Sequence, residues 1–217
     1  NDSAGNGIYT MSGATTTTAW LYNSMIILAG TGTPTSVQGN TFRNLAVSSA
    51  STSAAAMSCI RVNGGAVNIG TVTGNLVGAP NTDASVNPSI TFTNLATTAG
   101  GFIPIFPATV SACSVSNNTI AGIQLVGNST TTATDFNAIA YNSGTVSITN
   151  NTIGSSSTPF SIFASSTSST STATSRFAGI LISASGTSNG ITISGNTIAN
   201  MYSNFSSTGA PATTGAK

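Results

Sequence analysis

Charged side chains are almost missing from this sequence of 217 residues. Only 3% of its residues are Asp, Glu, Lys or Arg, and it contains neither His nor Glu. The acidic residues are Asp2, Asp83 and Asp135. Glycoside hydrolysis usually needs paired carboxylates, zinc sites need His or Cys ligands, serine triads need a general base, and calcium sites need several carboxylates. Because no such set is clustered in the sequence, we expect no enzymatic activity, no metal and no cofactor.

Basic residues and long apolar runs are also scarce. The basic residues are Arg43, Arg61, Arg176 and Lys217, and the net charge is +1. They form no basic patch, so we expect no nucleic-acid partner. The longest apolar runs, at 25–29 and 102–106, are too short to span a membrane, so we expect no membrane insertion. Residues 1–7 lack the pattern of a signal peptide, and we therefore expect a chain that is processed or cut from a longer protein.

Two cysteines are too few for a disulfide framework. Cys113 lies two residues before Val115, so in a strand both side chains are expected to share the inward face. Cys59 is next to Ile60 and is expected to face the other way. We interpret the two cysteines as unpaired thiols.

What the sequence does contain is a hexad that occurs five times. The copies are VQGNTF at 37–42, VTGNLV at 72–77, VSNNTI at 115–120, ITNNTI at 148–153 and ISGNTI at 193–198. We expect the first and last residues of a hexad, such as Val115 and Ile120, to point inward on either side of a corner. Gly and Asn adopt a left-handed backbone at low cost, which suits the corner itself. The fourth position predicts stacked asparagine corners at Asn40, Asn75, Asn118, Asn151 and Asn196.

The hexads begin 35, 43, 33 and 45 residues apart, which gives a double repeat of about 77 residues. Short β-branched runs between Gly, Asn and Pro predict strands, so the fold class is all-β, a parallel β-helix or solenoid. We expect each repeat to divide into two coils of about 20 residues, giving about ten coils and a rod of about 50 Å. The alternative fold is a tandem array of β-sandwich domains.

The repeats define one domain, or a fragment of a longer array. Its parts are a partial repeat at 1–36, double repeats at 37–114 and 115–192, and a partial repeat at 193–217. Ser/Thr-rich stretches at matching phases predict surface loops. They are found at 48–53, 128–134 and 165–175. The spacing also predicts a further strand near residue 217, so we expect either a longer array or subunits that stack end to end.

Several motifs resemble the repeats of very large secreted surface proteins of Bacteroidota. The motifs are ITNNTIGSSSTP at 148–159, the Ser/Thr run at 166–174 and GITISGNTIANM at 190–201, and the resemblance is close over 115–204 and loose over 37–114. That family includes adhesins exported by the type IX secretion route, some of them associated with gliding motility. The resemblance implies a right-handed β-helix, a secreted protein on the cell surface and a role as a stalk or adhesive fibre. It supplies no catalytic residue, and the sorting domain typical of such cargo is not part of this sequence.

These observations lead us to expect a structural repeat protein, a module or subunit of an extracellular filament or adhesin. Its expected partners are other copies of itself, because low charge removes most of the repulsion between identical copies. An alternative is ice binding, for which the fifth hexad position supplies one threonine column broken by Leu76. The threonines of that column are Thr41, Thr119, Thr152 and Thr197.

A further alternative is carbohydrate binding, with surface glycans as partners and aromatic rings as a stacking platform. The candidate rings are Tyr141, Phe160, Phe163, Phe177 and Tyr202. Phe136 and Phe177 each precede an isoleucine by three residues, at Ile139 and Ile180. This matching phase favours a structural role for both phenylalanines.

Overall fold

The computed structural model describes residues 9–13, 21–53, 55–96, 100–127, 134–166, 176–183 and 190–204. The described residues form β-strands and no helix. Every strand pairing among them is parallel. The alternative of tandem β-sandwich domains is therefore wrong for this part of the chain, because sandwiches are built from antiparallel sheets.

The strands form four parallel sheets, which we call A to D. Sheet A contains β1 (Tyr9–Gly13), β5 (Leu45–Ser49), β9 (Ile90–Asn94), β14 (Ile123–Gly127), β18 (Ile162–Ser166) and β22 (Met201–Ser203). Sheet B contains β2 (Tyr22–Leu28), β6 (Met57–Gly64), β10 (Gly101–Phe102), β11 (Ile105–Pro107), β15 (Asp135–Tyr141) and β19 (Phe177–Ile182). Sheet C contains β3 (Thr35–Val37), β7 (Ala66–Ile69), β12 (Ala112–Ser116), β16 (Thr145–Thr149) and β20 (Ile191–Ser194). Sheet D contains β4 (Thr41–Phe42), β8 (Leu76–Gly78), β13 (Thr119–Ala121), β17 (Thr152–Gly154) and β21 (Thr197–Ala199).

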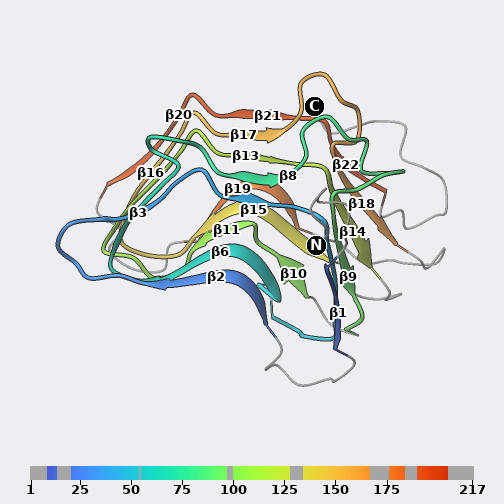
Figure 1. Cartoon of the computed structure of the whole chain (residues 1–217), viewed down its shortest axis with the longest axis horizontal. Helices are drawn as coiled ribbons and strands as arrows, with labels where there is room; N and C mark the ends of the chain where they lie inside the picture. The colour runs from blue at the N-terminus through green and yellow to red at the C-terminus, as the bar shows by residue number, and fades with distance from the viewer. Residues whose placement is uncertain are drawn as a thin grey trace.

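The chain visits the sheets in the order B, C, D, A and then begins again, in a solenoid-like stack (Figure 1). We call each such round a level. Level 1 is β2 to β5, level 2 is β6 to β9, level 3 is β10 to β14, level 4 is β15 to β18 and level 5 is β19 to β22. Strand β1 pairs with β5 and so lies beyond level 1, in sheet A. In Figure 1 sheet C lies on the left, sheet D along the top and sheet A on the right.

One hexad spacing corresponds to one level. Val115 of β12 pairs directly with Ile148 of β16, and Ile148 in turn pairs with Ile193 of β20. The expectation of two coils per repeat, and of ten coils in all, was therefore wrong. With neighbouring strands about 4.8 Å apart, the described levels span roughly 20 Å along the stack rather than 50 Å.

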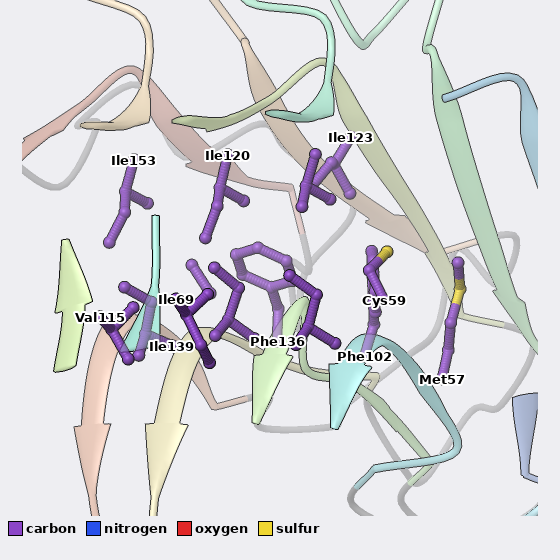
Figure 2. Close-up of a cluster of buried hydrophobic side chains, with 14 of the residues drawn as sticks. Met57, Cys59, Ile69, Phe102, Val115, Ile120, Ile123, Phe136, Ile139 and Ile153 are labelled. Carbon is purple, nitrogen blue, oxygen red and sulfur yellow. The ribbon is translucent and has the colours of Figure 1, made fainter. Parts of the chain in front are cut away.

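The core lies between the four sheets. In Figure 2 the side chains of Ile120 and Ile153 point across the core toward those of Ile69, Val115 and Ile139. All five are fully buried and belong to one hydrophobic cluster. Burial of these aliphatic side chains supplies the main favourable term in folding, at about 1.5–3 kcal/mol for each one.

A column of phenylalanines runs through the core beside the isoleucines. The ring centroids of Phe92 and Phe102 are 6.2 Å apart, those of Phe102 and Phe136 are 6.0 Å apart, and those of Phe136 and Phe177 are 5.5 Å apart. These distances are typical of favourable aromatic pairs. The structural role expected for Phe136 and Phe177 is confirmed.

An irregularity in β6 changes the direction of Cys59. Met57 and Ile60 both belong to the core although they are three positions apart, so side chains do not simply alternate between faces there. Both Cys59 and Ile60 donate their backbone N–H groups to the carbonyl oxygen of Pro104, at 3.1 and 3.0 Å. Cys59 is fully buried in the core, so the expectation that it faces outward was wrong.

The Ser/Thr-rich stretch at 48–53 is not a surface loop as expected. Ser49, Ala50 and Ser51 are buried, and Ser49 belongs to β5. The hydroxyl of Ser49 accepts a hydrogen bond from the backbone N–H of Ser51, at 3.1 Å, which satisfies that polar group inside the protein. Residues 128–133 and 167–175 of the other two stretches lie outside the described residues.

Candidate functional site

The asparagines at the fourth hexad position form one hydrogen-bonded column across all five levels. In each step, the backbone N–H and the side-chain Nδ2 of one asparagine both donate to Oδ1 of the asparagine on the next level, at 2.8–3.0 Å. The column runs in the order Asn40, Asn75, Asn118, Asn151 and Asn196. We call it the asparagine ladder.

Ladder side chains also donate hydrogen bonds to backbone carbonyl oxygens of sheet C on the level before them. Nδ2 of Asn118 donates to the carbonyl oxygen of Ile69 at 3.1 Å, and Nδ2 of Asn151 donates to that of Val115 at 2.9 Å. Because each amide joins two levels, a buried polar side chain becomes a cross-link instead of a cost. Asn75, Asn118 and Asn151 are buried, which is possible only because their polar atoms are paired.

The residue before the ladder asparagine has a left-handed backbone in four hexads. The φ angles are +63° at Gly39, +59° at Asn117, +57° at Asn150 and +65° at Gly195. Glycine and asparagine accept this conformation most readily. The corner predicted from the hexad is therefore found at the third position, and the fourth position faces inward as the ladder.

The second hexad departs from the pattern because the chain makes a detour there. Ile69 pairs with both Val37 and Val115, so it takes the inward place expected for Val72. Val72 is 85% exposed, and the expectation that it points inward was wrong. Oδ1 of Asn75 nevertheless keeps its place in the ladder. The detour is held by Oε1 of Gln38, which accepts hydrogen bonds from the backbone N–H groups of Val72 and Thr73, at 3.0 and 3.2 Å.

Level 5 has an apolar face that no further level in the described part of the chain covers. Ile193 and Ile198 are 47% and 52% exposed, although their counterparts on level 4, Ile148 and Ile153, are fully buried. Ile148 and Ile193 are direct register partners, as are Ile153 and Ile198. The exposed fractions therefore differ because level 5 covers the level 4 residues. Strands β19 to β22 are also the last strands described in their sheets, which leaves one edge of each unpaired within the described part of the chain.

The acidic residues do not come together. The Asp83 carboxylate accepts hydrogen bonds from the backbone N–H and the hydroxyl of Ser85, in the turn between β8 and β9. The Asp135 carboxylate accepts one from the backbone N–H of Arg176, at 2.9 Å, at the start of β15. Within the described ranges no three His, Cys, Asp or Glu side chains form a group that could hold a metal ion. Asp2 lies outside the described residues.

The two thiols are free, as predicted, and both are buried. Burial raises the pKa of Cys59 to about 12 and the pKa of Cys113 to about 12. Because the thiolate is the reactive form, neither side chain is suited to nucleophilic or redox chemistry near neutral pH.

The five candidate aromatic residues fall into two groups, so they do not form one stacking platform as expected. Tyr141 is fully buried and donates its hydroxyl hydrogen to the carbonyl oxygen of Gly144, and Phe177 packs against the core. Phe160, Phe163 and Tyr202 instead gather beside sheet A. The ring centroid of Phe160 is 6.0 Å from that of Phe163 and 5.0 Å from that of Tyr202, and the rings of Phe163 and Tyr202 are parallel at 5.7 Å.

The threonine column lies in sheet D as the hexads predict. Thr119 pairs with Leu76 on one side and with Thr152 on the other, and Thr41 and Thr197 complete the column. Leu76 interrupts it, and β13 and β17 contribute no second threonine beside it. No helix in the described part of the chain is long and apolar enough to cross a membrane.

Comparison of the chain with protein-family models, with curated proteins and with solved structures finds no match. The fold therefore defines a class only: an all-β protein of parallel sheets in a solenoid-like stack.

Proposed function

We propose that this chain is a right-handed parallel β-helix that serves as a structural module of an extracellular filament or adhesin, in which copies associate end to end. The observation that carries this proposal is the exposed apolar face of level 5. Solenoids normally need a polar cap at such a face, because it leaves core side chains and strand edges without partners. Right-handedness follows the strong preference of connections between parallel strands.

The surface chemistry supports association of identical copies. Net charge is only +1, so two copies repel each other weakly. A level that meets another level also gains the same backbone ladder and asparagine contacts that join levels within the chain. Placement on a bacterial surface rests on the resemblance of residues 115–204 to Bacteroidota surface repeats, and belongs to the proposal.

The experiment is sedimentation velocity across a wide concentration range, with electron microscopy of the same samples. Rods of increasing length are expected as concentration rises. Ile193→Asn is expected to weaken association by at least about tenfold, because an apolar contact is replaced by a polar one. Val72→Asn is the matched control: it makes the same kind of change at another exposed aliphatic residue, away from the level 5 face. A chain that stays monomeric at every concentration would contradict the proposal.

The three gathered aromatic rings favour one second candidate, binding of a neutral glycan. Phe160 is 37% exposed and has a φ of +48°, a conformation that is strained for a bulky residue. Such strain often marks a functional position. Affinity electrophoresis in gels containing neutral polysaccharides tests this candidate. Retardation that Phe160→Ala removes and Val72→Ala preserves would support it, and equal mobility in all gels would exclude it.

A further inference from the structure

The asparagine ladder has a direction, which gives its two ends different chemistry. Each asparagine donates toward the next level and accepts from the level before it. At one end, no hydrogen bond reaches Oδ1 of Asn40 from the described part of the chain. At the other, no hydrogen bond leaves the backbone N–H of Asn196 within that part. Among the described residues, level 1 therefore carries an unused acceptor and level 5 an unused donor.

The two ends also match in strand register. Phe42, Val77, Ile120, Ile153 and Ile198 occupy one inward row, and Phe42 begins it where Ile198 ends it. Thr41 and Thr197 are the first and last threonines of the outer column, and both are exposed. Level 1 of a second copy placed against level 5 would thus repeat a contact that already occurs four times inside the chain.

We infer that copies join head to tail in one register, with the backbone N–H of Asn196 donating to Oδ1 of Asn40 in the next copy. The inference rests on the proposed end-to-end association and names its geometry. In this contact β21 pairs with β4 and β20 pairs with β3. The occupant of the level 5 face is the level 1 face of a second copy of this chain.

Strand β1 occupies a position in sheet A that this contact requires. It pairs with β5 over five residues, and this is the place in sheet A that β22 of the preceding copy must take. On level 1 the inward residue Val37 is only 5% exposed, whereas its level 5 counterpart Ile193 is 47% exposed. β22 follows β21 with only Asn200 between them, so it cannot leave a contact that includes β21. In the described part of the chain β1 pairs with β5 alone, so its release breaks no other strand pairing there. In the inferred contact β1 therefore acts as a removable cap that limits assembly.

The test of the register uses two single variants, Thr41→Cys and Thr197→Cys, of the full chain. Neighbouring strands lie about 4.8 Å apart, within the range that a disulfide spans. After mild thiol oxidation, a mixture of the two variants is expected to give a covalent heterodimer, and each variant alone is expected to stay uncross-linked. The native cysteines do not interfere, because both are buried.

The outcomes separate this inference from the proposed function. Cross-linking of either variant with itself would show a symmetric contact and overturn the head-to-tail register. Association in sedimentation without the mixed disulfide would overturn the register and leave end-to-end association standing. Absence of association would overturn both.

A separate experiment tests whether β1 acts as a cap. Met11→Pro removes a backbone N–H from β1, which pairs through Met11 with Val47, and so weakens the cap. Association is expected to strengthen roughly tenfold, because more chains are competent to join. Met11→Ala, which keeps the N–H, is the control and is expected to associate as the parent does. Weaker association of the proline variant in a chain that remains folded by circular dichroism would overturn the role of β1.

Discussion

Levels 4 and 5 contain nearly the same hexad, ITNNTI at 148–153 and ISGNTI at 193–198, and place it in opposite environments. Ile148 is fully buried, whereas its register partner Ile193 is 47% exposed. The hexad places both isoleucines at the same position around their levels. The presence of another level beyond it decides whether an inward residue is buried. The same motif therefore contributes differently to the free energy of unfolding on different levels, and substitutions at matched positions can measure that difference.

The largest difference between an interior level and level 5 is expected for substitutions in the asparagine ladder, measured as the loss in the free energy of unfolding. Asn118→Ala removes the acceptor of the Asn75 backbone N–H and Nδ2, and the donor to the carbonyl oxygen of Ile69, all inside the protein. Each buried polar group left unpaired costs about 1–3 kcal/mol, so we expect unfolding to become easier by roughly 4 kcal/mol. Asn196→Ala on level 5 is expected to cost only about 1 kcal/mol, because water can replace its bonds to Asn151. Urea denaturation of dilute protein measures both, and equal losses would contradict the comparison.

A smaller difference in the free energy of unfolding is expected between inward isoleucines of levels 4 and 5. Ile148→Ala deletes fully buried atoms and leaves a cavity, which typically costs about 2–5 kcal/mol. Ile193→Ala removes side-chain atoms that are already half in water, so the expected loss is under about 1 kcal/mol in dilute protein. At concentrations where copies associate, the loss for Ile193→Ala should grow, since a neighbouring copy then covers the site. A loss that is large in dilute protein and independent of concentration would show that level 5 is covered within the chain.

The interior levels also predict a pH dependence. Cys59 and Cys113 have a pKa of about 12 in the folded chain, above the ordinary value of 9.0 that applies when the chain is unfolded. Between pH 9 and 12 the unfolded chain loses thiol protons that the folded chain keeps, so stability falls as pH rises. Each thiol contributes at most about 1.4 kcal/mol per pH unit in this window. The variant Cys59→Ala/Cys113→Ala should show a shallower decline in denaturant titrations at pH 8, 9 and 10, and identical slopes would contradict full burial of the thiols.

The hexads made the corners predictable because a corner is a local structure. A left-handed residue followed by a small polar side chain can be recognised within six residues, and Asn117, Asn150, Gly39 and Gly195 have positive φ angles, whereas Gly74 of the second hexad does not. The parallel all-β class was predictable for a similar reason, since the spacing of the hexads implies a stack. The structural role of Phe136 and Phe177 followed from their matching spacing to Ile139 and Ile180.

What the sequence did not predict depends on contacts between distant residues. The number of levels is set by which strands pair, and it is pairings such as that of Val115 with Ile148 that show one hexad spacing to make a whole level. The inward direction of Cys59 depends on an irregularity in β6 that the alternation rule does not anticipate. Burial of Phe106, which is only 7% exposed and lies beneath the guanidinium group of Arg61, has no local signal either.

The smallest expected effect concerns the detour on level 2, where the motif and the structure disagree. Val72 begins the hexad VTGNLV and yet lies outside the core, so Val72→Ala should change the free energy of unfolding by less than about 0.5 kcal/mol. Ile69→Ala, at the position that fills the inward row, is the paired variant and should cost about 2–5 kcal/mol. Chemical denaturation of the two variants under the same conditions compares them directly. If Val72→Ala proved the more costly, then the hexad itself would set the inward row on level 2, and the pairing of Ile69 with Val37 and Val115 would be wrong.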